Sequence, residues 1–415
     1  MRSDAVTTRG SEAVVDRAAW SRDAISADAR VEVSLVMPCL NEAETLPRCI
    51  EKAGRAIERH GLSAEIIVAD NGSTDGSTRI AEECGARVVP VRERGYGAAL
   101  MGGIAAARGA YVIMGDADDS YDWSAIFPFV ERLRANDDFV FGSRLPSGGG
   151  TILPGAMPWQ NRWIGNPALT AIGRLFFGAR VSDFHCGLRA FRKSAFEALN
   201  LRTTGMEFAS EMIVKATLQG HRISEVPITL YPHGRLRPPH LRRWRDGWRH
   251  LRFMLLFCPR WLFLMPGIAL CLVGGVFGSW LVFAPIYVGA AKLTLNTQLA
   301  CSMAVLAGFQ LITFAAFTKV FAVAEGLLPE DPRLTRLTEH HRMLEIGLLS
   351  GALLVVTGIG LFVLAVNHWR RLSFGELPYS EGLRFVIPAV TVITLGVQII
   401  FSSFFLSVLG LGRRT

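Results

Sequence analysis

Four carboxylates follow one apolar run of the sequence within seven residues. The stretch VIMGDADDSYDW carries Asp116, Asp118, Asp119 and Asp122 directly after its apolar start. Two carboxylates two residues apart at the end of a strand can bind one Mg²⁺ or Mn²⁺, with water and diphosphate oxygens as the other ligands. Such an ion neutralises the charge that develops on a departing nucleoside diphosphate. Acids at a strand end can equally be only solvated, so the neighbouring elements must decide.

Apolar runs alternate with helical patterns through the first half of the chain. Four runs predict buried strands: VEVSLVMP (31–38), AEIIVAD (64–70), ARVVPV (86–91) and AYVIMGDAD (110–118). The segments between them have the periodicity or the small-residue composition of helices. This alternation predicts an α/β fold with a doubly wound, mostly parallel sheet.

Polar residues stand at the carboxyl ends of three of these strands. The three clusters are Pro38 with Asn41 and Glu42, Asp70 with Asn71, and Asp116 with Asp118. Open α/β sheets bind ligands beyond the carboxyl ends of their strands, so the three groups should share one edge. A GxGxxG after the first strand and a GxxxxGK[ST] are both absent from the sequence, which disfavours nicotinamide enzymes and P-loop NTPases.

The last third of the chain is dominated by four apolar stretches, at 261–283, 299–324, 344–366 and 386–410. Each can cross a hydrocarbon core of about 30 Å as a helix. Buried helices of a large soluble protein are the alternative, but four such runs with few charges at one end disfavour it. The sequence therefore predicts an all-α transmembrane domain over 261–415.

The segment 233–260 carries much of the net charge of +8. Its arginines alternate with Trp and Leu beside the first span, which favours an interfacial amphipathic helix over a nucleic-acid partner. Residues 1–30 are polar, without the apolar core of a signal peptide, so we expect a disordered lead-in and a catalytic domain that faces the cytoplasm. Four spans would place the loop between the third and fourth spans on the outer side of the membrane. This loop carries Arg370, Arg371 and Arg384, which argues against that side.

The seven cysteines form no CxxC pair and no zinc spacing, so they predict reduced, packed thiols. His185 with Cys186 lacks partner ligands and is expected to pack in its loop. Asp119 and Asp122 are expected to be solvated or to cap a turn.

An ordered set of motifs resembles the inverting family 2 glycosyltransferases. The set is VSLVMPCLNEAETL, EIIVADNGSTDGST, a Gly/Ala-rich helix, MGDAD, FGSRL and SDFHCGLRAFRK. Within that family the chain is most similar to the polyprenyl-phosphate sugar synthases, the dolichol-phosphate mannose and glucose synthase group, over about residues 31–265. The resemblance implies a GT-A-like nucleotide-sugar-binding domain at 31–232, Mg²⁺ or Mn²⁺ at the DxD, and a lipid-phosphate acceptor.

The resemblance also implies residue roles. Nucleotide-sugar-binding residues would be Pro38, Leu40, Glu42, Asp70, Asn71, Ala117 and Arg144, and the metal ligands would be Asp116, Asp118 and Ser120. Acceptor-phosphate residues would be Arg162, Asn166, His233 and Arg235. The catalytic set would be Asp116, Asp118, Arg144, Arg162 and Asp183, and Glu207 and Glu211 would match the family's acidic helix.

Two departures from the family pattern stand out. Asn71 occupies a position where the family often has a second acid, which leaves the base preference open. The family's later Gly-x-Ser-Lys is replaced by GRLRPPH, so His233, Arg235 and Arg237 are its substitutes. Arg144 and Arg162 could also be surface salt-bridge partners.

The implied reaction is inverting transfer of a hexose from UDP-glucose or GDP-mannose to a polyprenyl or dolichyl phosphate at the cytoplasmic face of the plasma membrane. The acceptor phosphate is already anionic and needs little activation by a base. The two anions must be brought together, which explains a metal on one and arginine on the other.

Two further functions remain open. The extra spans could form a flippase or assembly module for the lipid-linked sugar, or could pack in a homo-oligomer. A processive polysaccharide synthase would also explain the spans, but in PWQNRW Gln160 and Arg162 are separated by one residue, whereas QxxRW needs two.

Overall fold

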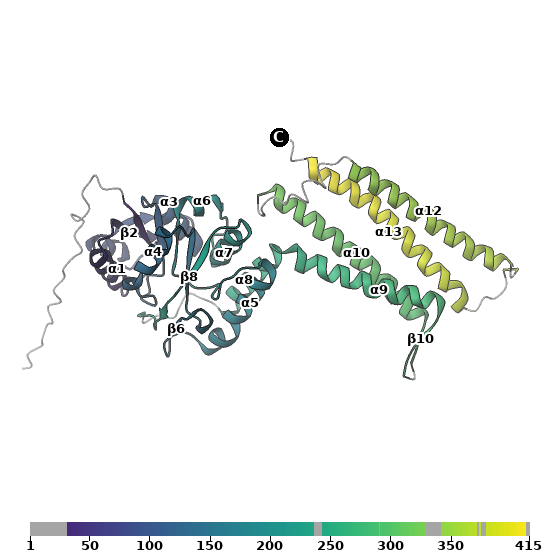
Figure 1. Cartoon of the computed structure of the whole chain (residues 1–415), viewed down its shortest axis with the longest axis horizontal. Coiled ribbons are helices and arrows are strands. Elements are labelled where there is room, and N and C mark those ends of the chain that lie inside the picture. Colours follow the sequence, from purple (N-terminus) through teal and green to yellow (C-terminus); the bar gives the residue numbers. More distant parts are fainter. Residues whose placement is uncertain are drawn as a thin grey trace, which may run out of the picture. The chain divides into compact units, whose positions relative to one another are not determined.

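The computed structural model describes residues 31–235, 243–289, 291–326, 328, 342–371, 373–374 and 379–411. The chain divides into two compact units (Figure 1). The first comprises Met1–Thr170, Val181–Met212 and His221–Asp246, and the second comprises Ala171–Arg180, Ile213–Gly220 and Gly247–Thr415. The lead-in expected over 1–30, and Arg237, lie outside the described residues.

A seven-stranded sheet forms the centre of the first unit, in the order β3-β2-β1-β4-β7-β5-β8. The strands are β1 (Val33–Cys39), β2 (Ala64–Asp70), β3 (Arg87–Pro90), β4 (Tyr111–Met114), β5 (Phe139–Ser143), β7 (Arg189–Arg192) and β8 (Ile223–Pro227). β1 pairs in parallel with β2 and β4, β2 with β3, and β5 with β8. The α/β class and the mostly parallel sheet are thus confirmed.

β7 is the exception, because it pairs antiparallel with both β4 and β5. Arg189, its first residue, pairs with Met114 at the end of β4 and with Phe141 near the end of β5. The segment that precedes β7 therefore arrives at the edge where β4 and β5 end. The local sequence pattern did not predict this reversed strand.

The helices that follow the strands are α1 (Leu46–His60), α2 (Ser77–Glu83), α3 (Tyr96–Ala106), α4 (Phe127–Arg134), α5 (Asn166–Phe177), α6 (Lys193–Ala198) and α7 (Phe208–Leu218). Of these, α1, α2, α3, α4 and α6 pack against the sheet, whereas parts of α5 and α7 belong to the second unit. Short elements join them: η2 (Trp123–Ala125), η3 (Pro146–Gly148), η4 (Asn161–Gly165), β6 (Thr151–Ile152) and β9 (Thr229–Leu230).

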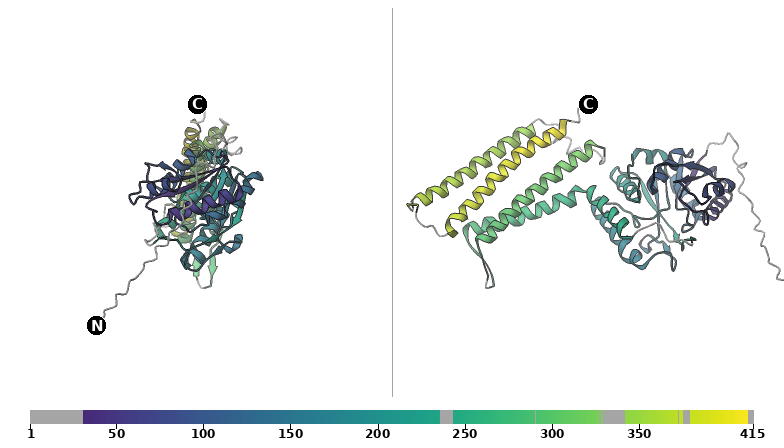
Figure 2. Two further views of the ribbon diagram at one scale, coloured as in Figure 1. Left: turned by 90° about the vertical axis from the view of Figure 1, so that its left-hand side faces the viewer. Right: turned by 180° about the vertical axis from the view of Figure 1, so that it is seen from behind.

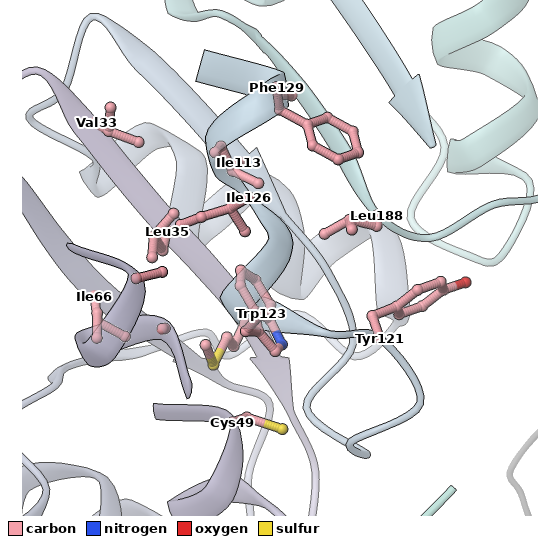
Figure 3. Packing of buried hydrophobic residues seen from close by; sticks show 14 of the residues in the cluster. Val33, Leu35, Cys49, Ile66, Ile113, Tyr121, Trp123, Ile126, Phe129 and Leu188 are labelled. Carbon is pink, nitrogen blue, oxygen red and sulfur yellow. The ribbon is translucent and has the colours of Figure 1, made fainter. Parts of the chain in front are cut away.

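The largest core lies between the sheet and the helices α1 and α4. α1 places Leu46, Ile50 and Ile57 on its buried side at helical spacing, and it ends at Gly61 in the left-handed conformation. Figure 3 shows Trp123 in this core. Its ring is fully buried, and this packing anchors the loop after β4 to the core.

The second unit contains the long apolar helices. They are α9 (Met265–Phe283), α10 (Leu295–Ala324), α12 (Arg342–Arg371) and α13 (Tyr379–Leu411), with a hairpin of β10 (Ile286–Val288) and β11 (Ala291–Leu293). The charged helix α8 (Arg243–Leu256) begins in the first unit and ends in the second, and the short η5 (Arg260–Leu264) follows it. Four segments are long and apolar enough to span a membrane: Arg260–Phe283, Leu295–Ala324, Leu344–Arg371 and Gly382–Leu409. The prediction of four such helices is confirmed, with ends that differ by a few residues.

These helices pack as two close pairs, α9 with α10 and α12 with α13, as both figures show (Figure 2). Glycines allow the close approach: a Cβ on Gly351 would lie 2.8 Å from the carbonyl oxygen of Gly396. α10 contacts α13 through neutral polar groups, where the hydroxyls of Ser302 and Thr391 lie 2.5 Å apart.

Candidate functional site

Asp116 lies two residues beyond the end of β4. Its Oδ1 accepts a hydrogen bond of 3.0 Å from the Tyr96 hydroxyl, at the start of α3. Its backbone oxygen accepts a bond of 3.2 Å from the Trp123 indole. Burial, and then the neighbouring Asp118 carboxylate, raise the pKa of Asp116 to about 6. Two carboxylates held in this way favour the presence of a cation.

Asp118 uses both of its carboxylate oxygens. Oδ1 accepts hydrogen bonds from the backbone N–H and the hydroxyl of Ser120, at 3.0 and 2.5 Å. Oδ2 lies 3.1 Å from Nη2 of Arg235. The Nε of Arg235 in turn donates to Oε2 of Glu42 at 2.8 Å. The hydroxyl of Ser120, predicted as a metal ligand, is therefore bonded to Asp118.

The loop after β1 is hydrogen-bonded to serines that follow β2. The backbone N–H of Asn41 donates to Ser73 Oγ and that of Glu42 to Ser77 Oγ, each at 2.9 Å. These bonds fix the backbone that presents Glu42, which is buried. Pro38 and Leu40 are half-buried on the same segment.

A second link joins the loop after β1 to the DxD segment. The hydroxyl of Thr45 donates to the carbonyl oxygen of Ala117 at 2.7 Å. Ala117 is buried and takes part in this link through its backbone carbonyl. The ends of β1 and β4 are thus tied together, as the convergence of their polar residues predicted.

The Asn71 side chain holds the loop before α3, and its contact with a nucleotide stays a prediction. Its side-chain amide donates to the carbonyl oxygens of Val91 and Glu93 at 3.2 and 2.6 Å, and its Oδ1 accepts from Gly95 N–H at 2.9 Å. Both amide hydrogens therefore hold the loop before α3 and neither can be donated to a base. Asp70 accepts from the backbone of Gly72 and Ser73 and closes a turn.

Arg144 and Asp183 form a buried bidentate ion pair. Nε of Arg144 donates to Oδ2 at 2.7 Å and Nη2 donates to Oδ1 at 2.9 Å. Burial alone would raise the pKa of Asp183, but the Arg144 guanidinium lowers it to about 2. The pair uses Nε and Nη2 of Arg144 and makes Asp183 the residue that positions this guanidinium, while a diphosphate contact of Arg144 stays a prediction.

Gly187 and Tyr121 belong to the site, although the sequence did not single them out. The backbone N–H of Gly187 donates to the Tyr121 hydroxyl at 2.8 Å. A Cβ on Gly187 would lie 2.9 Å from Oδ2 of Asp116. The glycine of the Asp-x-x-x-Gly stretch was the available signal: its lack of a side chain lets the backbone close against a carboxylate.

The acceptor-phosphate candidates are spread over two elements. Arg162 lies on η4, where Nη1 donates to Ile152 O at 3.4 Å, and Asn166 begins α5, where its amide contacts Met157 Sδ at 3.3 Å. Within the described ranges, no hydrogen bond or ion pair joins either residue to Asp116 or Asp118. His233 has a buried Nδ1 with no hydrogen-bond partner among the described residues.

The remaining acids have local roles. Glu211 is fully buried and accepts from the backbone of Arg202 and Thr203, so it holds the loop before α7. Asp119 pairs with Lys52 at 2.6 Å, and Asp122 caps η2 through the backbone N–H of Ser124.

The donor set fits a divalent ion that also binds substrate. Among the described residues no group of three or more His, Cys, Asp or Glu could hold a metal by itself. Mg²⁺ commonly takes one or two carboxylates and completes its shell with water and substrate phosphates. Asp116 and Asp118 supply that number, and the raised pKa of Asp116 indicates charge that a cation would relieve.

Two family models match the chain. "Glycosyl transferase family 2" matches residues 34–199, and "Glycosyltransferase family 2 C-terminal transmembrane region" matches residues 316–410. Together they cover the strands that carry the site, without β8 of the same sheet, and the last spans.

Two curated relatives are from Haloferax volcanii. The low-salt glycan biosynthesis hexosyltransferase Agl6 is 39% identical over 390 residues, which is 93% of this chain and 91% of that protein. A dolichyl-phosphate hexose transferase is 29% identical over 48% of this chain and 82% of its own length. A crystal structure of glucosyl-3-phosphoglycerate synthase from Mycobacterium tuberculosis, with Mn²⁺, UDP and glucosyl-3-phosphoglycerate, shares 24% identity over 54% of this chain and 78% of that chain, with a TM-score of 0.43.

Proposed function

The chain belongs to glycosyltransferase family 2 and carries that family's C-terminal transmembrane region, and from this premise we propose its reaction. It transfers a hexose from a nucleotide sugar, UDP-glucose or GDP-mannose, to a polyprenyl or dolichyl phosphate with inversion at the anomeric carbon. The catalytic unit faces the cytoplasm. The names of two relatives, a hexosyltransferase and a dolichyl-phosphate hexose transferase, support the sugar and the acceptor.

One observation carries the donor half of this proposal. Asp116 and Asp118 leave β4 at the edge where β1 and β2 also end, beside Glu42 and Asp70. A nucleoside diphosphate bound at this edge would have its base side near β1 and β2 and its diphosphate near the DxD. When bound, Mg²⁺ or Mn²⁺ would be held by Asp116 and Asp118 and would neutralise charge on the leaving diphosphate.

The chain's other residues orient this pair. Tyr96 fixes the Asp116 carboxylate from α3, and Gly187 closes against its other oxygen. The ion pair of Arg144 with Asp183 braces the segment that leads to Gly187. Rigid placement of the carboxylates lowers the reorganisation that the reaction requires.

Arg162 supports the acceptor half. It lies between Trp159 and Trp163, whose side chains are 62% and 66% exposed, and its guanidinium is 5.2 Å from the Trp163 ring. Exposed tryptophans suit the boundary of a bilayer, and an arginine among them suits a lipid phosphate. The phosphate is already an anion, so no residue needs to act as a base.

The test uses membranes that contain the full chain, radiolabelled UDP-glucose or GDP-mannose, and extraction of lipid product. We expect a metal-dependent lipid monosaccharide that Asp118→Asn abolishes. Asp119→Asn is the matched control, because that carboxylate pairs with Lys52 outside the site, and it should retain most activity. A labelled polymer would instead identify a processive synthase, and no product with either donor would refute the proposal.

A further inference from the structure

Arg235 joins the two halves of the candidate donor site. Its guanidinium bonds Glu42, from the loop after β1, through Nε, and Asp118, from the DxD, through Nη2. The side chains are 12% exposed for Arg235, 5% for Glu42 and 14% for Asp118. These contacts are therefore shielded from solvent and are stronger than surface ion pairs.

The backbone before Arg235 is fixed against the DxD segment. Tyr231 N–H donates to Ser120 O and Gly234 N–H donates to Asp118 O, both at 3.0 Å. These two backbone hydrogen bonds place Arg235 next to Asp118. Its position does not depend on the free reach of a long side chain.

The bonds at Asp118 bring Arg235 into competition with a divalent ion. Oδ1 of Asp118 already accepts two hydrogen bonds from Ser120, and Oδ2 is the oxygen that faces Arg235. A cation that approaches Oδ2 meets the positive guanidinium at 3.1 Å from the same oxygen. The guanidinium must move before the ion can bind, and it needs another anion to replace the carboxylate it leaves.

We propose that Arg235 couples binding of the divalent ion to binding of a nucleoside diphosphate. Without nucleotide, Arg235 neutralises Asp118 and Glu42 and weakens binding of the ion. With a nucleoside diphosphate present, the guanidinium transfers to a phosphate oxygen and Asp118 becomes available. This inference rests on the proposed function, because it takes the DxD as the metal site. Such coupling is reciprocal, so each ligand raises the affinity for the other.

The test measures Mn²⁺ binding to the purified full chain by the electron paramagnetic resonance signal of free Mn²⁺, with and without UDP or GDP. Arg235→Ala should bind Mn²⁺ alone about tenfold more tightly, the size expected from losing one charge-assisted hydrogen bond. The gain that UDP or GDP adds should be smaller in Arg235→Ala than in the unchanged chain. Equal or weaker Mn²⁺ binding by Arg235→Ala overturns the proposal.

Three further variants sharpen the result. Lys52→Ala removes a cation that pairs with Asp119, outside the proposed coupling, and should change Mn²⁺ affinity by less than about twofold. Glu42→Gln should weaken binding of Mn²⁺ alone, because Arg235 then keeps only Asp118 of its two carboxylates. This loss should disappear when Arg235→Ala is added; a loss that persists in the double variant would make Glu42 a ligand and overturn the proposed role. Asp118→Asn should lose Mn²⁺ binding.

Failure of the coupling is distinguishable from failure of the function. Unchanged Mn²⁺ binding by Asp118→Asn refutes the metal site itself, whereas lipid product with no effect of Arg235→Ala on Mn²⁺ refutes the coupling alone. Farnesyl phosphate replaces the nucleotide in a last arm. The assignment of the guanidinium to the donor diphosphate would be overturned by one pattern. In it, farnesyl phosphate raises Mn²⁺ affinity through Arg235, whereas UDP and GDP do not.

Discussion

Asp183 binds both the backbone and the guanidinium of Arg144. Oδ2 accepts from Arg144 N–H at 3.1 Å and from its Nε at 2.7 Å, and the carboxylate has no exposed surface. Asp183→Asn would leave a buried guanidinium without a counter-charge, which costs about 3 to 5 kcal/mol. We expect a matching loss in thermal stability, measured by tryptophan fluorescence. Glu32→Gln, at the exposed pair with Arg134, should cost less than about 1 kcal/mol.

A double variant separates stability from activity in this pair. Arg144→Met with Asp183→Leu removes both charges and should recover most of the stability that Asp183→Asn loses. Transfer activity should stay low, because the segment toward Gly187 loses its ionic brace. Full activity in the double variant would show that the pair serves stability alone.

Glu65 predicts how stability responds to acid. Burial alone would raise the pKa of Glu65, but hydrogen bonds from Arg108 N–H, Arg87 and Ser34 lower it below its ordinary value. The stabilisation is therefore complete above the pKa of the unfolded chain, near 4.5, and is lost as pH falls through the lower folded value. Glu65→Gln should flatten the fall in unfolding free energy below about pH 5.

The control for Glu65 is Glu51, which is exposed in α1 and pairs with Arg55 one turn away. Glu51→Gln should leave the acid response of the unfolding free energy unchanged. A steep loss that persists in Glu65→Gln would show that other groups dominate this pH range.

Tyr96→Phe removes the hydroxyl that orients Asp116. Groups that orient metal ligands commonly contribute about tenfold or more to metal affinity. We expect Mn²⁺ binding and kcat/KM to fall by about that factor, with little change in thermal stability. Tyr111→Phe is the control on β4, because its ring contacts Arg192 away from the DxD. Unchanged Mn²⁺ affinity in Tyr96→Phe would contradict this role.

Gly187→Ala places a methyl group against the site. The added carbon would lie 2.9 Å from Asp116 Oδ2 and 3.1 Å from the Tyr121 ring, so one of them must shift. A displacement of this size should lower activity by about 100-fold, with a modest loss in stability. Gly275→Ala, which has open space around its Cβ, should be neutral. Equal activity of the two variants would refute the tight fit.

The glycine contact between α12 and α13 gives a prediction for the membrane region. A side chain at Gly351 would meet Ile400 Cγ1 at 2.6 Å as well as the Gly396 carbonyl. Gly351→Ile should lower the unfolding free energy by about 1 to 3 kcal/mol through overpacking. Gly360→Ile, with nothing within 4 Å of its Cβ, is the control in the same helix. The midpoint of thermal unfolding in detergent measures both.

Local sequence patterns predicted the part of the site that depends on strand ends. β2, β1 and β4 are neighbours in the sheet and run in parallel. Their carboxyl ends therefore lie at one edge, which Glu42, Asp70 and Asp116 share. The four apolar helices were equally readable, because length and composition define them. In both cases the information lies within short stretches of chain.

The remaining features depend on contacts between distant residues. Arg235 reaches Glu42 across 193 positions, and no local period encodes such a partner. The antiparallel β7 has only four residues, too few to reveal its direction. The position of Asn71 at a strand end is visible in the sequence, whereas its hydrogen bonds to the loop before α3 are not.

The place of β7 also has a consequence for how the protein folds during synthesis. β1 to β4 can pair as soon as residue 114 has left the ribosome, but β4 meets β7 only when residue 189 follows. Contacts of such long sequence separation form late, because closing a long loop costs entropy first. The acidic edge therefore stays incomplete until β7 has emerged, and its contact with Arg235 can form only shortly before the first membrane helix, which begins at Arg260.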